Sequence, residues 1–225
     1  MNEWDEYWKK QVITIDQEMQ YCEQREDIRI FSKYLPRKGT ILEAGCGIGI
    51  VCSYLSKKTN TQIVGLDTSS EALQLISKGA ENNCWFIKGD VNKLPVKDHS
   101  FDLVVSLGVI EHLDNPEIAV RDMERVLKKE GILFLSTPNA HCYTHRMVRF
   151  LKRCMKTWKI GKEASFSLSQ LEDLLSQSLI IETGYFYWGR RPFFKTFKNL
   201  LGGVFLKFGS MVYVIAKRKG TPRRK

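Results

Sequence analysis

A run of three glycines between a predicted strand and a predicted helix constrains the fold of this chain more than any other feature. The run reads Ile41-Leu-Glu-Ala-Gly45-Cys-Gly47-Ile-Gly49. Glycines at such a turn let the backbone bend tightly and let a ligand approach it closely. The helix that follows presents free N–H groups, which suit a carboxylate or a phosphate. The loop therefore predicts a ligand site at the carboxyl end of a strand.

Strand-like and helix-like segments alternate along most of the chain. The apolar runs that predict strands lie at 40–44, 62–66, 84–88, 101–107, 131–136, 180–187 and 210–217. The segments that predict helices lie at 3–34, 49–58, 69–79, 116–129 and 168–178. Alternation of this kind predicts an α/β fold, in which helices cover both faces of a mostly parallel sheet.

The length of 225 residues suits one domain built around one sizeable core. We therefore expect a single domain over 1–225. Its parts are an N-terminal helical segment at 1–36, a ligand-binding core at 37–137, and a second half at 138–225 with basic amphipathic insertions at 146–162 and 190–208.

Two acidic residues near the glycine loop indicate what kind of ligand it serves. Glu43, just ahead of the first glycine, would repel a pyrophosphate and attract an ammonium or sulfonium group. Asp67 follows the second strand, where a carboxylate accepts hydrogen bonds from the hydroxyl groups of an adenosine ribose. Ile50 stands where the dinucleotide fingerprint has its third glycine. Glu43 and Ile50 together disfavour an NAD-dependent oxidoreductase.

With these motifs and several more, the chain resembles the class I S-adenosylmethionine-dependent methyltransferases, and in particular their small-molecule and quinone-type O-methyltransferase branch. The stretches that carry the resemblance are Leu42–Gly49, Gly65–Asp67, Lys88–Val91, Phe101–Ser106 with Glu111-His112, and Arg125–Gly131. They occur in the order and spacing of that family and span residues 37–137. The resemblance implies a Rossmann-like, doubly wound, seven-stranded sheet, mostly parallel with an antiparallel last strand.

The resemblance also implies where S-adenosyl-L-methionine binds. The glycine loop is expected under the methionine moiety and the ribose, with Glu43 near the methionine ammonium and Asp67 at the ribose. The adenine is expected near Asp90, and the reacting sulfonium at the end of the fourth strand. The full set of expected cofactor contacts is Glu43, Gly45, Cys46, Gly47, Gly49, Asp67, Thr68, Asp90, Val91, Ser106, Leu107 and Gly108.

Fewer sequence motifs indicate how the methyl acceptor is bound. A sulfonium is already a strong methyl donor, so the main task of the protein is to align the acceptor for direct in-line displacement. An oxygen acceptor, which we favour, also needs a base, for which His112 is the candidate and His141 a further one. Glu111 is expected to bind the acceptor or a cation. Metal-binding branches of the family carry Glu-x-x-Glu-His here, but Gly108 replaces the first acid, so no metal is expected.

The net charge of +10 is unevenly distributed along the chain. Residues 1–140 carry 17 Lys and Arg against 21 Asp and Glu, whereas 141–225 carry 18 against 4. The segment 146–162 holds seven basic residues and no acid, with apolar residues at helical spacing, and 190–208 repeats this mixture. We expect these segments to form a lid that rests on an anionic membrane surface or on a lipid-linked acceptor. A small-molecule acceptor, with both segments over the pocket or at a dimer interface, is the main alternative.

Other functions remain open at this point. A basic segment also suits the phosphates of RNA or DNA, although no recognisable nucleic-acid-binding module accompanies it. A non-catalytic regulator that binds S-adenosylmethionine would keep the same cofactor motifs. Scattered cysteines, an N-terminus unlike a signal peptide, and no apolar stretch long enough for a transmembrane helix predict a cytoplasmic protein, with peripheral membrane contact if the lid hypothesis holds.

Overall fold

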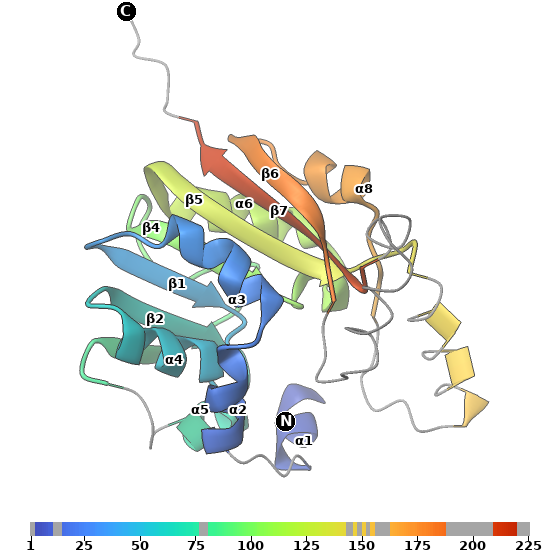
Figure 1. Ribbon diagram of the computed structural model, residues 1–225, viewed down its shortest axis with the longest axis horizontal. Helices are drawn as coiled ribbons and strands as arrows, with labels where there is room; N and C mark the ends of the chain where they lie inside the picture. The colour runs from blue at the N-terminus through green and yellow to red at the C-terminus, as the bar shows by residue number, and fades with distance from the viewer. Residues whose placement is uncertain are drawn as a thin grey trace, which may run out of the picture.

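The computed structural model describes most of the chain and is drawn in Figure 1. The described residues are 3–10, 15–76, 81–142, 146–147, 150–151, 154–155, 163–187 and 209–219. The basic segment 190–208 lies outside them, and only six residues of 146–162 lie inside. None of the helices in these ranges has the length and apolar composition needed to cross a bilayer.

Seven strands form one sheet in the order β3-β2-β1-β4-β5-β7-β6. β7 runs antiparallel to both of its neighbours, and every other neighbouring pair is parallel. The predicted Rossmann-like sheet with an antiparallel last strand is therefore confirmed. The strands are β1 (Thr40–Ala44), β2 (Gln62–Asp67), β3 (Cys84–Lys88), β4 (Phe101–Leu107), β5 (Leu127–Pro138), β6 (Ser178–Phe186) and β7 (Met211–Arg218).

The direction of strand addition reverses at β1. The strands that follow it in sequence, β2 and β3, lie on one side of it, whereas β4 and β5 lie on the other. In open sheets of this kind, ligands bind in the crevice beyond the carboxyl ends of the strands at such a reversal. The fold therefore predicts a ligand site at the carboxyl ends of β1, β2 and β4.

Helices cover both faces of the sheet (Figure 1). Because side chains alternate along a strand, each strand contributes to two separate cores. On one face Ile41 and Ile63 pack with α3 (Glu26–Phe31) and α4 (Ile50–Lys58). On the other face strand residues such as Leu42 pack with α6 (Pro116–Val126) and α8 (Leu168–Asp173).

The N-terminal segment is helical, but it is not the continuous helix predicted at 3–34. It contains α1 (Glu3–Lys9), α2 (Ile15–Cys22), α3 and a short 3-10 turn. Between α2 and α3, Arg25 has an extended backbone and donates to the Asp27 carboxylate at 3.1 and 2.5 Å. Helix α1 packs against α5 (Ser70–Ile76).

Two predicted helices also end earlier than expected. The helix predicted at 116–129 ends at Val126, because Leu127 already pairs with Phe101 and begins β5. The helix predicted at 168–178 ends at Asp173, and β6 begins five residues later. At Leu127 strand pairing, which depends on distant residues, outweighs the local preference for helix.

Candidate active site

The glycine loop connects β1 to α4 at the point where strand addition reverses. Gly45 and Gly47 have φ angles of +81° and +52°, in the left-handed region that glycine adopts without strain. The N–H groups of Gly45 and Cys46 donate to the Leu66 carbonyl of β2 at 2.8 and 2.9 Å. These bonds fix the loop to the end of the neighbouring strand.

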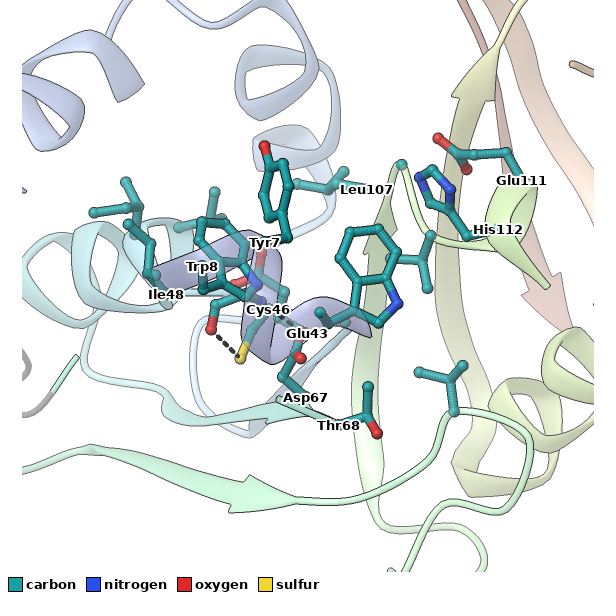
Figure 2. Close-up of a pocket in the computed structure, with 18 of the residues that line it drawn as sticks. Tyr7, Trp8, Glu43, Cys46, Ile48, Asp67, Thr68, Leu107, Glu111 and His112 are labelled. Atoms are coloured by element: carbon teal, nitrogen blue, oxygen red, sulfur yellow. Dashed lines mark hydrogen bonds between the residues drawn. The ribbon is translucent and has the colours of Figure 1, made fainter. Parts of the chain in front are cut away.

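Asp67, the last residue of β2, holds the same loop through its side chain. Its carboxylate accepts hydrogen bonds from the N–H groups of Gly47 and Ser69, both at 2.8 Å. Burial raises the pKa of Asp67 above its ordinary value, while these backbone bonds lower it. The side chain also lines a cavity (Figure 2). There the carboxylate can accept hydrogen bonds from the hydroxyl groups of a ligand.

Glu43 is buried near the end of β1, with 5% of its surface exposed. It accepts hydrogen bonds from the Cys52 N–H at 3.1 Å and from the Cys52 thiol at 2.8 Å. Burial raises the pKa of Glu43 to about 7, and the nearby Arg25 acts in the opposite direction. A cation in the cavity would favour the ionised form of this carboxyl. Its predicted contact with an ammonium group stays a prediction.

The cavity has a volume of about 810 Å³, within the usual range for small-molecule sites. Residues from the ends of β1, β2 and β4 meet in it with residues from α1 and from the turn η2 (Ile110–His112), as Figure 2 shows. The predicted site residues that line it are Glu43, Gly45, Cys46, Gly47, Asp67, Thr68, Asp90, Val91, Leu107, Gly108, Glu111 and His112.

Three predicted residues lie apart from the described lining of this cavity. Ser106 is fully buried, and its hydroxyl donates to the Ala44 carbonyl at 3.1 Å. That carbonyl lies just past the last paired residues of β1 and β4, so the Ser106 side chain links the two strands at their ends. Gly49 caps α4 from outside the cavity, and His141 is an exposed loop residue. The placement of Ser106 at the reacting centre stays a prediction.

Helix α1 contributes three lining residues that the sequence analysis did not assign to the site: Trp4, Tyr7 and Trp8. A Cβ atom on Gly47 would lie 2.7 Å from the Trp8 ring, so Trp8 packs directly on the glycine loop. The carboxylate of Asp5 accepts a hydrogen bond from the Ser69 hydroxyl at 2.7 Å and fastens α1 beside Asp67. Figure 2 shows Tyr7 and Trp8 within the pocket.

Glu111 and His112 lie together on one side of the pocket, away from Cys46 and Ile48 (Figure 2). Glu111 accepts a hydrogen bond from the Thr137 hydroxyl at 3.1 Å. Burial, with a smaller contribution from the nearby acid Glu163, raises the pKa of Glu111 to about 8. The His112 ring packs edge-on against Trp4, with ring centroids 4.9 Å apart. Two groups able to exchange a proton therefore share this end of the cavity.

Within the part of the chain that the structure describes, no group of three or more His, Cys, Asp or Glu side chains is arranged to hold a metal ion. Gly108 has a φ angle of +69°, and a Cβ atom there would lie 3.3 Å from a carboxylate oxygen of Glu111. The backbone at this position thus leaves the Glu111 side chain its space at the cavity.

Sequence comparison supplies a second line of information on this site. Residues 42–135 match the family model described as a methyltransferase domain. The chain is 37% identical over 91 residues to ajmaline N-methyltransferase from Rauvolfia serpentina. This match covers 38% of this chain and 31% of that enzyme. It is 33% identical over 122 residues to demethylmenaquinone methyltransferase from Thermotoga maritima, and this match covers 52% of this chain and 52% of that enzyme. The matches span a third to a half of the length of these relatives.

Solved structures share the fold over more of the chain. A complex between the Haloferax volcanii Trm112 methyltransferase activator and a methyltransferase contains a similar chain, with a TM-score of 0.72 and 13% identity over 98% of this chain and 99% of that one. An S-adenosylmethionine-dependent methyltransferase from Mesorhizobium loti gives a TM-score of 0.68 and 18% identity, with 87% and 99% covered. At these identities the likeness concerns the fold.

Proposed function

We propose that this chain, whose residues 42–135 match the model of a methyltransferase domain, uses S-adenosylmethionine to transfer a methyl group to a small or lipid-linked acceptor. The observation that carries the proposal is the convergence of the glycine loop and Asp67 on one wall of the cavity. The loop offers close backbone approach at Gly45 and Gly47, and Asp67 offers a carboxylate for ribose hydroxyls. Glu43 offers a carboxyl group for an ammonium.

The bound cofactor would supply a methyl group on a positively charged sulfur. The task that remains for the chain is to orient the acceptor, and orientation alone can contribute about 7–11 kcal/mol. For an oxygen acceptor, which we favour from the sequence, we propose that His112, whose ring packs against Trp4, takes the proton. The names of the relatives include both N- and O-methyltransferases, so they support methyl transfer without selecting the acceptor atom.

We expect S-adenosylhomocysteine to raise the melting temperature of the full chain, and NAD at the same concentration to leave it unchanged. A ligand present at one hundred times its Kd stabilises the folded state by about 2.7 kcal/mol, which corresponds to roughly 5–10 °C for a chain of this length. NAD shares the adenosine but brings a pyrophosphate that Glu43 would repel. Thermal shift measurements decide the matter, and a larger shift with NAD would contradict the proposal.

We further propose that the segment 146–162 meets an anionic membrane surface. Its described apolar side chains are all exposed: Met147 by 59%, Phe150 by 65%, Leu151 by 49% and Met155 by 70%. Their spacing of three, four and eight residues places them along one side of a helix. The seven basic residues and the absence of acids in this segment complement a negatively charged bilayer.

Sedimentation with vesicles tests this surface. The chain is expected to sediment with phosphatidylglycerol-containing vesicles at low salt and to remain in solution with pure phosphatidylcholine. Phe150→Ser combined with Met155→Ser is expected to lower the affinity for these vesicles at least about a hundredfold, since each apolar side chain buried in the bilayer contributes about 1.5–3 kcal/mol and 1.4 kcal/mol corresponds to about tenfold. Leu75→Ser with Ile118→Ser, which alters two exposed apolar residues elsewhere, is the matched control. Equal sedimentation of both double variants would contradict the proposed surface.

A further inference from the structure

One oxygen of the Glu43 carboxylate is bound twice by Cys52, the third residue of α4. The Cys52 N–H donates to Oε2 of Glu43 at 3.1 Å, and the Cys52 thiol donates to the same oxygen at 2.8 Å. Gly49, at the N-cap position of α4, provides no side-chain hydrogen bond to the first turn of this helix. The Glu43 carboxylate therefore takes the place of a capping group, where the helix dipole favours negative charge.

The two oxygens of Glu43 differ in their surroundings. Within the part of the chain that the structure describes, both hydrogen bonds to the Glu43 side chain go to Oε2, and none goes to Oε1. Glu43 lines the cavity (Figure 2), although only 5% of its surface is exposed. A carboxylate that is held by one oxygen presents the other in a defined direction, which suits the cationic group of a ligand.

The environment of Cys52 keeps its thiol in the form that can donate. The side chain is fully buried. Burial, with smaller contributions from the neighbouring thiols of Cys46 and Cys84, raises the pKa of Cys52 well above its ordinary value. A thiol that retains its proton donates to a carboxylate, whereas a thiolate beside Glu43 would repel it. Cys52 is therefore a hydrogen-bond donor to Glu43 throughout the neutral pH range.

We propose that Cys52 is a positioning residue for the cofactor, because it holds Oε2 of Glu43 so that Oε1 meets the ammonium group of the methionine moiety. This inference rests on the proposed use of S-adenosylmethionine and deepens it. The ammonium belongs to the part of the cofactor that a simple nucleoside lacks. Cys52 thereby favours a ligand that carries the amino acid over one that ends at the sulfur.

The ionisation of Glu43 makes this contact depend on pH. Burial raises the pKa of Glu43 to about 7, whereas the bonds from Cys52 and the charge of Arg25 lower it. The titratable and charged groups that face Glu43 come from α2, the start of α3, the glycine loop and α4: Cys22, Arg25, Asp27, Cys46 and Cys52. The carboxylate form binds an ammonium and the protonated form does not. Affinity for the amino-acid end should therefore rise as the pH rises through 7 and level off above it.

Two ligands with the same adenosine test the contact. S-adenosylhomocysteine carries the amino acid, and 5′-methylthioadenosine has only a methyl group on the same sulfur. The ratio of their affinities, measured by calorimetry on the full chain, isolates the amino-acid end from the ribose and the adenine. This ratio is expected to rise about tenfold from pH 6 to pH 8 in the wild type, because the ionised fraction of a carboxyl with a pKa of about 7 rises from about a tenth to about nine tenths. In Glu43→Gln the ratio should not change with pH.

Substitutions of Cys52 separate positioning from packing. Cys52→Ala removes a thiol that lowers the pKa of Glu43, so the rise of the ratio should move to higher pH, and the ratio at pH 7 should fall at least about threefold. Cys52→Ser restores a donor and should return the ratio to within about twofold of the wild type. Cys84→Ala, which alters another thiol beside Cys52, is the matched control and should keep the wild-type profile. Affinity for 5′-methylthioadenosine should stay nearly constant in all three variants.

The possible failures are distinguishable. If neither ligand binds the folded wild type, the proposed use of S-adenosylmethionine is wrong, and this inference is wrong with it. If S-adenosylhomocysteine binds, but Cys52→Ala shows the wild-type ratio at every pH, the positioning role of Cys52 alone is wrong. A loss in Cys52→Ser as large as in Cys52→Ala, or an equal loss in Cys84→Ala, would assign the effect to packing and overturn the inference as well.

Discussion

Replacement of Asp67 by alanine is expected to abolish measurable binding of S-adenosylhomocysteine to this chain. The change removes the carboxylate proposed to hold the ribose hydroxyls. It also removes the acceptor for the N–H groups of Gly47 and Ser69, both 2.8 Å away in the structure. Hydrogen bonds to a charged group contribute about 1.5–3 kcal/mol each. Loss of two or more should therefore weaken binding by at least a hundredfold, as calorimetric titration would measure.

Two further variants make this experiment interpretable. Asp67→Asn keeps one acceptor oxygen and is expected to bind with intermediate affinity. Asp98→Ala removes an exposed acid that pairs with Arg125, far from the described cavity lining, and should bind as the wild type does. Each variant is first shown to be folded by circular dichroism. Binding by Asp67→Ala within threefold of the wild type would mean that the ligand is held elsewhere.

Gly45→Ala is expected to have an effect of similar size for a different reason. The φ angle of +81° at Gly45 is strained for any other residue. The added Cβ atom would also lie 2.4 Å from a methyl carbon of Val109, which leads into the turn that carries Glu111 and His112. The variant should therefore displace both the glycine loop and the turn that carries Glu111 and His112. We expect at least a hundredfold loss of S-adenosylhomocysteine affinity and a lower melting temperature.

A double variant separates the two causes. In Gly45→Ala combined with Val109→Ala the steric conflict is removed, whereas the backbone strain of about 1–2 kcal/mol remains. Binding should therefore recover in part, to within about thirtyfold of the wild type by the usual relation of 1.4 kcal/mol per tenfold. Val109→Ala alone serves as the reference. If the double variant binds no better than Gly45→Ala, the contact with Val109 is not the cause of the loss.

The fold was largely accessible from the sequence because its signals are local or periodic. Apolar runs of strand length alternate with helical segments, and a parallel sheet follows from that alternation. The helix end that was predicted wrongly, at residues 127–129, depends on strand pairing with residues far away in the sequence. Leu127 becomes strand because Phe101 lies beside it, and no local pattern around residues 127–129 contains that information.

The candidate site was accessible in part for a similar reason. Gly45 and Asp67 end neighbouring parallel strands, so their proximity follows from the fold alone. Ser106 follows the same rule by position, yet its hydroxyl donates to the Ala44 carbonyl, one residue past the last β1–β4 pair. The direction of a single side chain depends on which polar group nearby lacks a hydrogen bond.

By itself, the sequence determined the features of the proposed cofactor side: a glycine turn after one strand, an acid after the next, and a methyltransferase-like order of motifs. These features are encoded by neighbouring residues whose geometry the backbone dictates. Only the tertiary structure decided that Trp4, Tyr7 and Trp8 line the cavity and that Glu111 is buried beside Glu163. An amphipathic helix can dock wherever an apolar surface accepts it, and the pKa of a carboxyl group depends on burial that many distant segments create together.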